Sequence, residues 1–223
     1  MKKLLISAMV TLTLMTPTNI FADPIDAVAS VAAAENSGSA WVARFPGSTS
    51  VDDLNDPFKS NVKRFIAALH EAGISTSVKS TYRPLERAYL MHWSWMIANK
   101  KASPKDAPAK AGVNIKWVHD NDDANFSKSI AGARAMVNGY GISELKVAPA
   151  LNSNHTARNA IDLATSWSKS SVVITDANGK KVTINSGEKN STNATLISVA
   201  KTYGLVHYTP VNNDKNHFSP NGR

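Results

Sequence analysis

The sequence predicts an α+β fold in which helices pack on a small, mostly antiparallel sheet. Segments with helical patterns come early in the chain, and β-rich segments come late. The stretch VVITDANGKKVTI (172–184) contains two β-rich runs joined by Asp-Ala-Asn-Gly, a pattern typical of a β-hairpin. No internal repeat is present. Helices followed by strands within one chain of 223 residues indicate a single α+β domain behind a short leader.

The first 22 residues have the layout of a secretory signal peptide. Lys2 and Lys3 precede the apolar run LLISAMVTLTLM, Pro17 follows that run, and Ala22 supplies a small residue for cleavage. The alternative is an N-terminal membrane anchor, but the run is shorter than the roughly 18 apolar residues expected of a span. We therefore expect cleavage after Ala22, a periplasmic or secreted protein, and no stable membrane insertion.

The composition bounds the partners and the chemistry. Loss of Lys2 and Lys3 with the leader lowers the formal net charge from +8 to +6, so the mature protein stays basic. A basic exported protein meets anionic cell-envelope polymers, and no Lys/Arg stripe with interleaved aromatic residues points to nucleic acid. Cysteine is absent, so any metal site must use His, Asp or Glu. We expect a monomer.

We expect an irregular arm over residues 23–56, with Trp41 and Phe45 as packing anchors. The folded domain is expected over residues 57–223. A helix begins at Pro57, with Asp56 as its N-cap and Gly73 as its end. Its apolar positions share one face and are Phe58, Val62, Phe65, Ile66 and Leu69.

The remaining elements follow in order. We expect a strand over 77–83, a buried helix over 85–100, a surface loop over 100–112 and a helix over about 125–138 that ends at Gly139 or Gly141. Strand character returns over 146–165. The hairpin 172–184, a helix over 190–204 and strands within 205–210 and 213–219 complete the domain.

Two of the six histidines are expected to be structural, and a third stands in a loop interpreted as a solvated helix start. His70 and His92 lie inside predicted helices beside apolar residues. His119 stands in an acidic loop that lacks the residue spacing of an EF-hand. Acidic residues are favourable near a helix N-terminus, so this loop is better interpreted as the start of the helix that follows.

The other histidines suggest a metal site. SNHTARNAIDL (153–163) carries His155 and Asp162, although a polar loop that runs into a strand explains this stretch equally well. His217 follows Asp214 by three residues. Catalytic zinc takes three protein ligands and keeps one position open, and His155, Asp162 and His217 would supply two nitrogens and one oxygen.

Three motifs in this order resemble the zinc D-Ala-D-Ala peptidase family (M15-type), whose members act on peptidoglycan stem peptides. The family pattern reads S-x-Y-R, then S-x-H-x-x-G-x-A-x-D, then a carboxylate-x-x-H followed by an aromatic residue. The resemblance spans about residues 57–219. The matching residues are Ser80, Tyr82 and Arg83; Ser153, His155, Ala160 and Asp162; and Asp214, His217 and Phe218.

The resemblance implies an exported zinc peptidase that cuts D-amino-acid-containing bonds in stem peptides or cross-links. One Zn²⁺ would be held in a cleft by His155, Asp162 and His217. Asp214 would take a proton from the attacking water and deliver it to the leaving amine, and Arg83 would stabilise the oxyanion. Peptidoglycan or its muropeptides would be contacted by the remaining site residues, which are Ser153, Tyr82, Arg158 and His207. His207 stays open between a cleft residue, an outer-shell partner and a packed histidine.

Three positions depart from the family pattern. Arg158 replaces its glycine, and would narrow the pocket or meet a substrate carboxylate. Asp214 replaces the more common Glu, and Phe218 replaces Trp. Arg158 and Asp214 keep open the alternative of a zinc-containing module that binds the cell wall without turnover. A further alternative is an antibacterial toxin with the same chemistry, which nothing in the sequence separates from wall remodelling.

Overall fold

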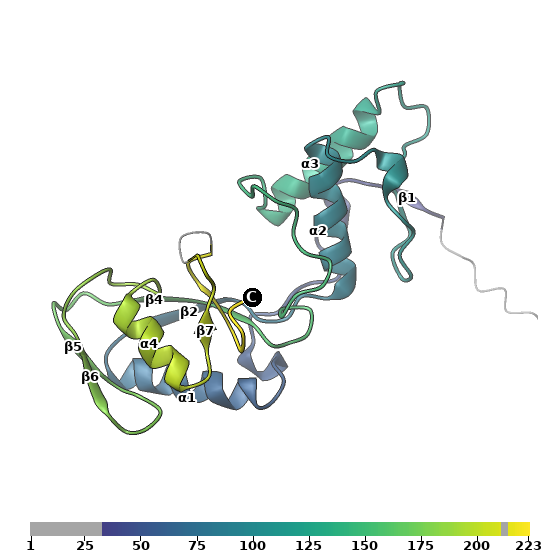
Figure 1. Cartoon of the computed structure of the whole chain (residues 1–223). Helices are drawn as coiled ribbons and strands as arrows, with labels where there is room; N and C mark the ends of the chain where they lie inside the picture. The colour runs from purple at the N-terminus through teal and green to yellow at the C-terminus, as the bar shows by residue number, and fades with distance from the viewer. Residues whose placement is uncertain (1–32, 211–213) are drawn as a thin grey trace, which may run out of the picture. The chain divides into compact units, whose positions relative to one another are not determined.

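The computed structural model describes residues 33–210 and 214–223 of the chain (Figure 1). These residues form four α-helices and three small sheets, which confirms the α+β class. The predicted signal peptide and residues 23–32 of the arm lie outside the described residues. Among the residues described, no helix has the length and apolar character that crossing a membrane requires.

A four-stranded antiparallel sheet contributes to the first of two hydrophobic cores. Its strands are β2 (Ser75–Ser80), β4 (Ile161–Ser166), β8 (His217–Ser219) and β7 (Val206–His207), in that spatial order. Helices α1 (Phe58–Glu71) and α4 (Ala194–Thr202) share one hydrophobic core with β4 and β8. The hairpin of β5 (Val172–Thr175) and β6 (Lys181–Ile184) joins this core and is confirmed as predicted.

The first helix agrees closely with its sequence pattern. The predicted apolar positions of α1 pack into the core, and the carboxylate of Asp56 accepts a hydrogen bond from the backbone N–H of Ser60 at 3.3 Å. Asp56 thus satisfies a free N–H of the first turn. The prediction that Asp56 is the N-cap is wrong by one residue, because the helix begins at Phe58 and its N-cap is Pro57. The helix ends at Glu71 with Ala72 as its C-cap, two residues before the predicted stop, Gly73. Gly73 makes the turn that follows, with a left-handed φ of 74° that suits glycine, and its N–H donates to the carbonyl of His70.

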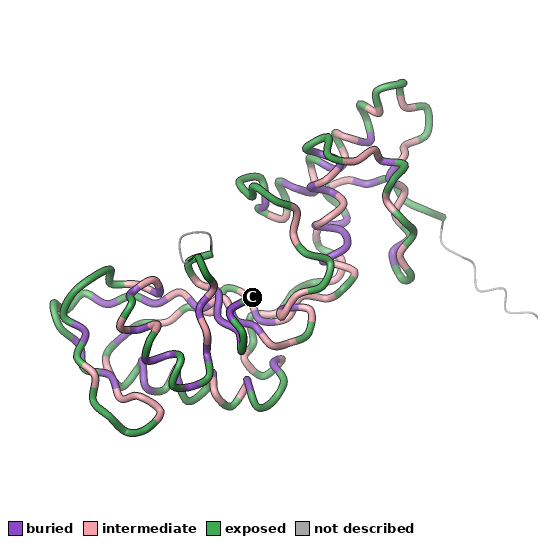
Figure 2. The backbone as a smooth tube through the Cα atoms, in the orientation of Figure 1, coloured by how far each residue is buried: buried purple, intermediate pink, exposed green. Residues whose placement is uncertain are grey.

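A second core lies between α2 (Leu85–Ala98) and α3 (Ser127–Tyr140), and buried residues occur along this helix pair as well as along the sheet (Figure 2). Trp41 is buried in this core, as expected of an anchor. The two glycines near the end of α3 have different roles. A Cβ at Gly139 would lie 2.7 Å from Val42, so glycine there permits close packing, whereas Gly141 ends the helix with a φ of 66°.

The smaller elements are distributed over both cores: Val51 packs against the first core, and Trp41 and Ile115 pack in the second. Strand β1 (Glu35–Asn36) pairs in parallel with β3 (Ile115–Lys116). Short 3₁₀ helices span Ser39–Trp41, Val51–Asp53 and Pro104–Asp106. The first two belong to the predicted arm, which therefore carries local structure from residue 33 onward.

Two predicted strands are shorter than expected. Strand β2 stops at Ser80 because the backbone N–H and hydroxyl of Thr81 turn away to the carbonyl of Ser48. Of the predicted segment 146–165, only the part from Ile161 is a strand. Residues 153–159 form local turns, with hydrogen bonds such as Asn159 N–H to the carbonyl of Asn154, and these compete with a strand ladder.

Candidate metal centre

The register of the sheet brings Asp162 and His217 together. They are direct partners on the neighbouring antiparallel strands β4 and β8, and Ser80 is the partner of Asp162 on the other side. Ile161 and Leu163 are fully buried in the core on the opposite face of β4. Since side chains alternate along a strand, these two residues direct Asp162 away from the core, as the sequence predicts.

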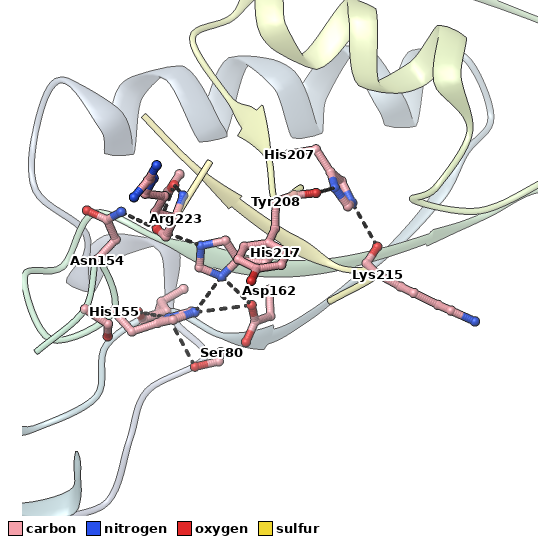
Figure 3. Close-up of polar contacts among 12 residues, drawn as sticks. Ser80, Asn154, His155, Asp162, His207, Tyr208, Lys215, His217 and Arg223 are labelled. Carbon is pink, nitrogen blue, oxygen red and sulfur yellow. Dashed lines mark hydrogen bonds and ion pairs between the residues drawn. The ribbon is translucent and has the colours of Figure 1, made fainter. Parts of the chain in front are cut away.

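His155 reaches the same place from the loop before β4 (Figure 3). It lies in the local turns of residues 153–159, and its carbonyl accepts the backbone N–H of Arg83 at 3.2 Å. On the imidazole ring, Nδ1 lies 2.9 Å from the carbonyl oxygen of Thr81. The ring is buried, so the loop after β2 fixes both the backbone and the side chain of His155.

The three side chains meet in an equilateral triangle. Nε2 of His155 lies 3.2 Å from Oδ1 of Asp162 and 3.2 Å from Nδ1 of His217, and the last two atoms are also 3.2 Å apart. Ligand atoms of a tetrahedral ion bound at about 2.0 Å lie about 3.3 Å from one another. Among the described residues, this is the one group of three or more His, Asp or Glu side chains close enough to share an ion.

The outer contacts of both rings direct their lone pairs into the triangle. Nδ1 of His155 faces the carbonyl of Thr81, and Nε2 of His217 faces the carbonyl of Arg223 at 3.1 Å. A carbonyl only accepts, so each of these nitrogens carries the ring proton, and in the neutral rings the inner nitrogens are left unprotonated. Two lone pairs and a carboxylate oxygen at 3.2 Å repel one another unless a positive charge lies between them. The group can therefore hold a metal ion.

The same crowding perturbs the titration of the metal-free group. Burial raises the pKa of Asp162, but the two histidine rings outweigh this effect and hold its pKa well below the usual range. Burial lowers the pKa of His217, but the adjacent Asp162 carboxylate raises it by more than burial lowers it. The net pKa of His217 is therefore above its ordinary value. In both cases the triangle favours a positive charge at its centre.

The triangle opens into a cavity of about 640 Å³. Three other predicted site residues, Arg83, Ser153 and Asp214, line this cavity with it. The half-buried guanidinium of Arg83 makes no hydrogen bond or ion pair with any residue that the structure describes. Burial lowers the pKa of Arg83, and the charges of Asp162 and Asp214 partly oppose that shift. Arg83 thus offers unused donors next to the metal ligands.

Asp214 is exposed at the rim of the cavity. Its charge raises the pKa of both His217 and Arg83, which shows that it lies within electrostatic range of both. Ser153 is held to Thr156 in the turn around His155. The Ser153 carbonyl accepts a hydrogen bond from the Thr156 hydroxyl, and the Ser153 backbone N–H donates to the oxygen of the same hydroxyl.

The structure adds cavity residues that sequence reasoning missed. Glu144 contributes a third carboxylate beside Asp162 and Asp214, and Lys146 a cation, and neither belongs to one of the three motifs. Tyr208 also lines the cavity, with its ring 6.1 Å from that of His217. Strand alternation could have found Tyr208, because a residue next to the buried His207 faces the opposite side of β7.

Tyr82 and Arg158 contact each other instead of lining the cavity. The guanidinium of Arg158 lies 3.7 Å from the centre of the Tyr82 ring and donates to the carbonyl of Asp53 at 3.1 Å. Arg158 has a left-handed φ of 59°. Glycine adopts this conformation more easily than any other residue, and Arg158 stands at the position where the family pattern has glycine.

His207 is a packed histidine. Its ring stands edge-on to Phe218 at 4.7 Å, and its two nitrogens lie within 3.1 Å of the carbonyls of Tyr208 and Lys215. The other three histidines, His70, His92 and His119, each contact one polar atom outside the triangle.

The acidic loop behaves as a helix start. Asp123 accepts the backbone N–H of Ser127, and Asp122 accepts those of Lys128 and Ser129, all in the first turn of α3. These carboxylates satisfy amides that have no partner within the helix.

Comparison of the chain with protein-family models, with curated proteins and with solved structures yields no match. The resemblance to the zinc D-Ala-D-Ala peptidases thus stays a prediction from the three motifs. The geometry of the triangle and its cavity carries the functional argument.

Proposed function

We propose that this protein is an exported zinc-dependent peptidase that hydrolyses D-amino-acid-containing bonds in peptidoglycan stem peptides or cross-links. One observation carries the proposal: the triangle of His155, Asp162 and His217 opens into the same cavity as the Asp214 carboxylate and the Arg83 guanidinium. Among residues 33–210 and 214–223, that guanidinium has no hydrogen-bond or ion-pair partner. A metal site that faces a cavity with a base and an oxyanion donor has the parts that hydrolysis needs.

The donor set favours zinc. Two imidazole nitrogens and one carboxylate oxygen with tetrahedral spacing match the three-ligand sets of catalytic zinc sites. The open cavity leaves room for water and substrate on the remaining side. When bound there, zinc supplies Lewis-acid activation of water and of a peptide carbonyl.

The chain's own residues supply proton transfer and charge stabilisation. Asp214 accepts the proton of the attacking water and returns it to the leaving amine. Arg83 directs its N–H groups to the oxygen on which negative charge develops, and its free donors require no existing contact to break. The exposed position of Asp214 leaves its carboxylate free to turn toward a substrate.

The walls of the cavity and the charge support a peptidoglycan substrate. Ala148, Pro149 and Ala150 form a wall of small apolar side chains that suits the methyl groups of alanine-rich peptides. The formal net charge of +6 that remains once the predicted leader is removed from the +8 of the full chain attracts an anionic wall polymer. The sequence resemblance to D-Ala-D-Ala peptidases points to the same substrate class.

Digestion of purified peptidoglycan tests the proposal. We expect zinc-loaded wild type to release fragments whose masses identify the bond that is cut. His155→Ala removes a ligand and Asp214→Asn removes the base, so both variants should lose release by 100-fold or more. Glu144→Gln is the matched control, because it neutralises another cavity carboxylate, and it should retain activity.

Two results would change the assignment. Wild type that binds one zinc and pellets with peptidoglycan but releases nothing supports a wall-binding module. Full activity in Asp214→Asn together with loss in Glu144→Gln would move the base to Glu144. The toxin alternative shares this chemistry, and is tested by whether walls of the producing cell resist digestion while foreign walls do not.

A further inference from the structure

We propose that residues 219–223 form a hook that positions the His217 ring for metal binding. The hook does this by holding the carbonyl oxygen of Arg223 against the outer nitrogen of that ring. This inference rests on the metal-binding part of the proposed function and is independent of peptidase activity. It makes Asn154, Ser219 and Gly222 positioning residues of the metal centre.

The Arg223 carbonyl oxygen is held from several sides (Figure 3). It lies 3.1 Å from Nε2 of His217, and it accepts the hydroxyl of Ser219 at 3.0 Å and a side-chain N–H of Asn154. The backbone N–H of Arg223 donates back to the Ser219 hydroxyl oxygen at 3.0 Å. Ser219 itself is fully buried, and its hydroxyl also lies 3.2 Å from the side-chain oxygen of Asn221.

Gly222 makes the turn that the hook requires. Its φ is 73°, and an added Cβ would lie 2.9 Å from the carbonyl oxygen of His207 and 3.0 Å from the Val206 side chain. Side chains other than glycine therefore face both backbone strain and a collision with β7. The turn is stabilised further by Asn221, whose side-chain oxygen accepts the N–H of Arg223 at 3.1 Å.

The hook also connects the loops of two ligands. Asn154 directly precedes His155, and its side chain donates to Asn221 at 2.8 Å as well as to the Arg223 carbonyl. Ser219 lies two residues after His217 in β8. One small hydrogen-bonded unit thus spans the His155 turn and the His217 strand, 62 residues apart in the chain.

The contact between the Arg223 carbonyl oxygen and Nε2 of His217 determines which ring nitrogen carries the proton. Because a carbonyl cannot donate, it selects Nε2–H and leaves the Nδ1 lone pair facing His155 and Asp162. Outer partners of this kind orient metal-bound histidines, and their loss typically weakens metal affinity 10- to 100-fold. The hook should therefore act on affinity and on the His217 tautomer while the fold stays intact.

Competition titrations with Zn²⁺ and Co²⁺ test the hook, together with nitrogen NMR of the His217 ring in the metal-free protein. We expect Asn154→Ala and the double variant Asn154→Ala/Ser219→Ala to bind both metals at least tenfold more weakly than wild type. The absorption bands of bound Co²⁺ should shift, and the Nε2–H tautomer of His217 should lose its dominance. Asn152→Ala, an exposed change on the same loop, is the control and should match wild type.

The outcomes separate this inference from the proposed function. Unchanged affinity and an unchanged His217 tautomer in Asn154→Ala overturn the hook, whatever the activity. Weaker affinity in that variant supports the hook even if wild type cuts no peptidoglycan. Wild type that binds neither metal overturns both proposals. Asn154 is only partly buried, so its single variant keeps the test valid if the double variant does not fold.

Discussion

Asp162 and His217 face each other across two antiparallel strands, and Oδ1 of Asp162 lies 3.2 Å from Nδ1 of His217. A sheet register thus fixes two of the three proposed ligands relative to each other. His155 completes the triangle from a loop whose own hydrogen bonds hold it. Ligands fixed in this way cost little entropy to organise when an ion binds.

Metal binding should stabilise the fold. An ion that binds the folded state alone stabilises it by about 2.7 kcal/mol when its free concentration is 100 times the dissociation constant. We expect zinc to raise the thermal midpoint of wild type, and a chelator to reverse the rise. Melting curves of His155→Ala should not respond to zinc, whereas those of His70→Ala, an exposed change on α1, should respond as wild type does. An equal response in both variants would place the ion elsewhere.

Replacement of Arg83 by lysine should lower kcat more than it changes KM. Lysine keeps the charge but loses the planar pair of donors. Loss of one oxyanion donor typically costs about 10²–10³ in kcat, so we expect a tenfold or larger decrease in peptidoglycan hydrolysis. Lys146→Ala removes another cation from the same cavity and serves as the comparison. Similar losses in the two variants would point to general attraction of the substrate.

Arg158 combines a strained backbone with two favourable contacts. Alanine at this position keeps the left-handed φ and loses the contacts with Tyr82 and Asp53, so it should destabilise the fold by about 1–2 kcal/mol. Glycine loses the same contacts but relieves the strain. We expect Arg158→Gly to be more stable than Arg158→Ala by about 0.5–1 kcal/mol in urea unfolding. The reverse order would show that the backbone at this position is unstrained.

The start of α3 should make stability depend on pH. Partial desolvation raises the pKa of Asp122, but hydrogen bonds from the Ser129 hydroxyl and from the backbone N–H groups of Lys128 and Ser129 lower it well below the usual range. A pKa that is lower in the folded state contributes stability above about pH 4, the ordinary value for aspartate, and this stability is lost as the pH falls further.

Unfolding of Asp122→Asn by urea at two pH values checks this contribution. The variant should be less stable than wild type at pH 7, and the difference should shrink toward pH 2. Asp120→Asn alters an exposed ion pair with Lys116 and should show a much smaller difference at pH 7. A difference for Asp122→Asn that is independent of pH would assign its role to packing.

Local patterns in the sequence account for most of the helices. The apolar spacing and the Gly73 stop give α1 nearly to the residue, because these signals depend on neighbours along the chain. The strands were less predictable. Residues 146–160 have strand-like composition, but turns with local hydrogen bonds around His155 prevail over it, and pattern reasoning does not weigh such bonds.

The sequence by itself determined the candidates for the site: His155, Asp162 and His217 as ligands, with Arg83 and Asp214 beside them. The ligands follow from residue type, because few side chains can bind a metal, and Arg83 and Asp214 follow from the resemblance of the three motifs to the zinc D-Ala-D-Ala peptidases. Only the tertiary structure decided that Tyr82, Arg158 and His207 pack elsewhere, and that Glu144 and the Arg223 carbonyl belong to the cavity and its outer shell. These placements depend on strand register and loop closure between distant segments, and no local pattern encodes them.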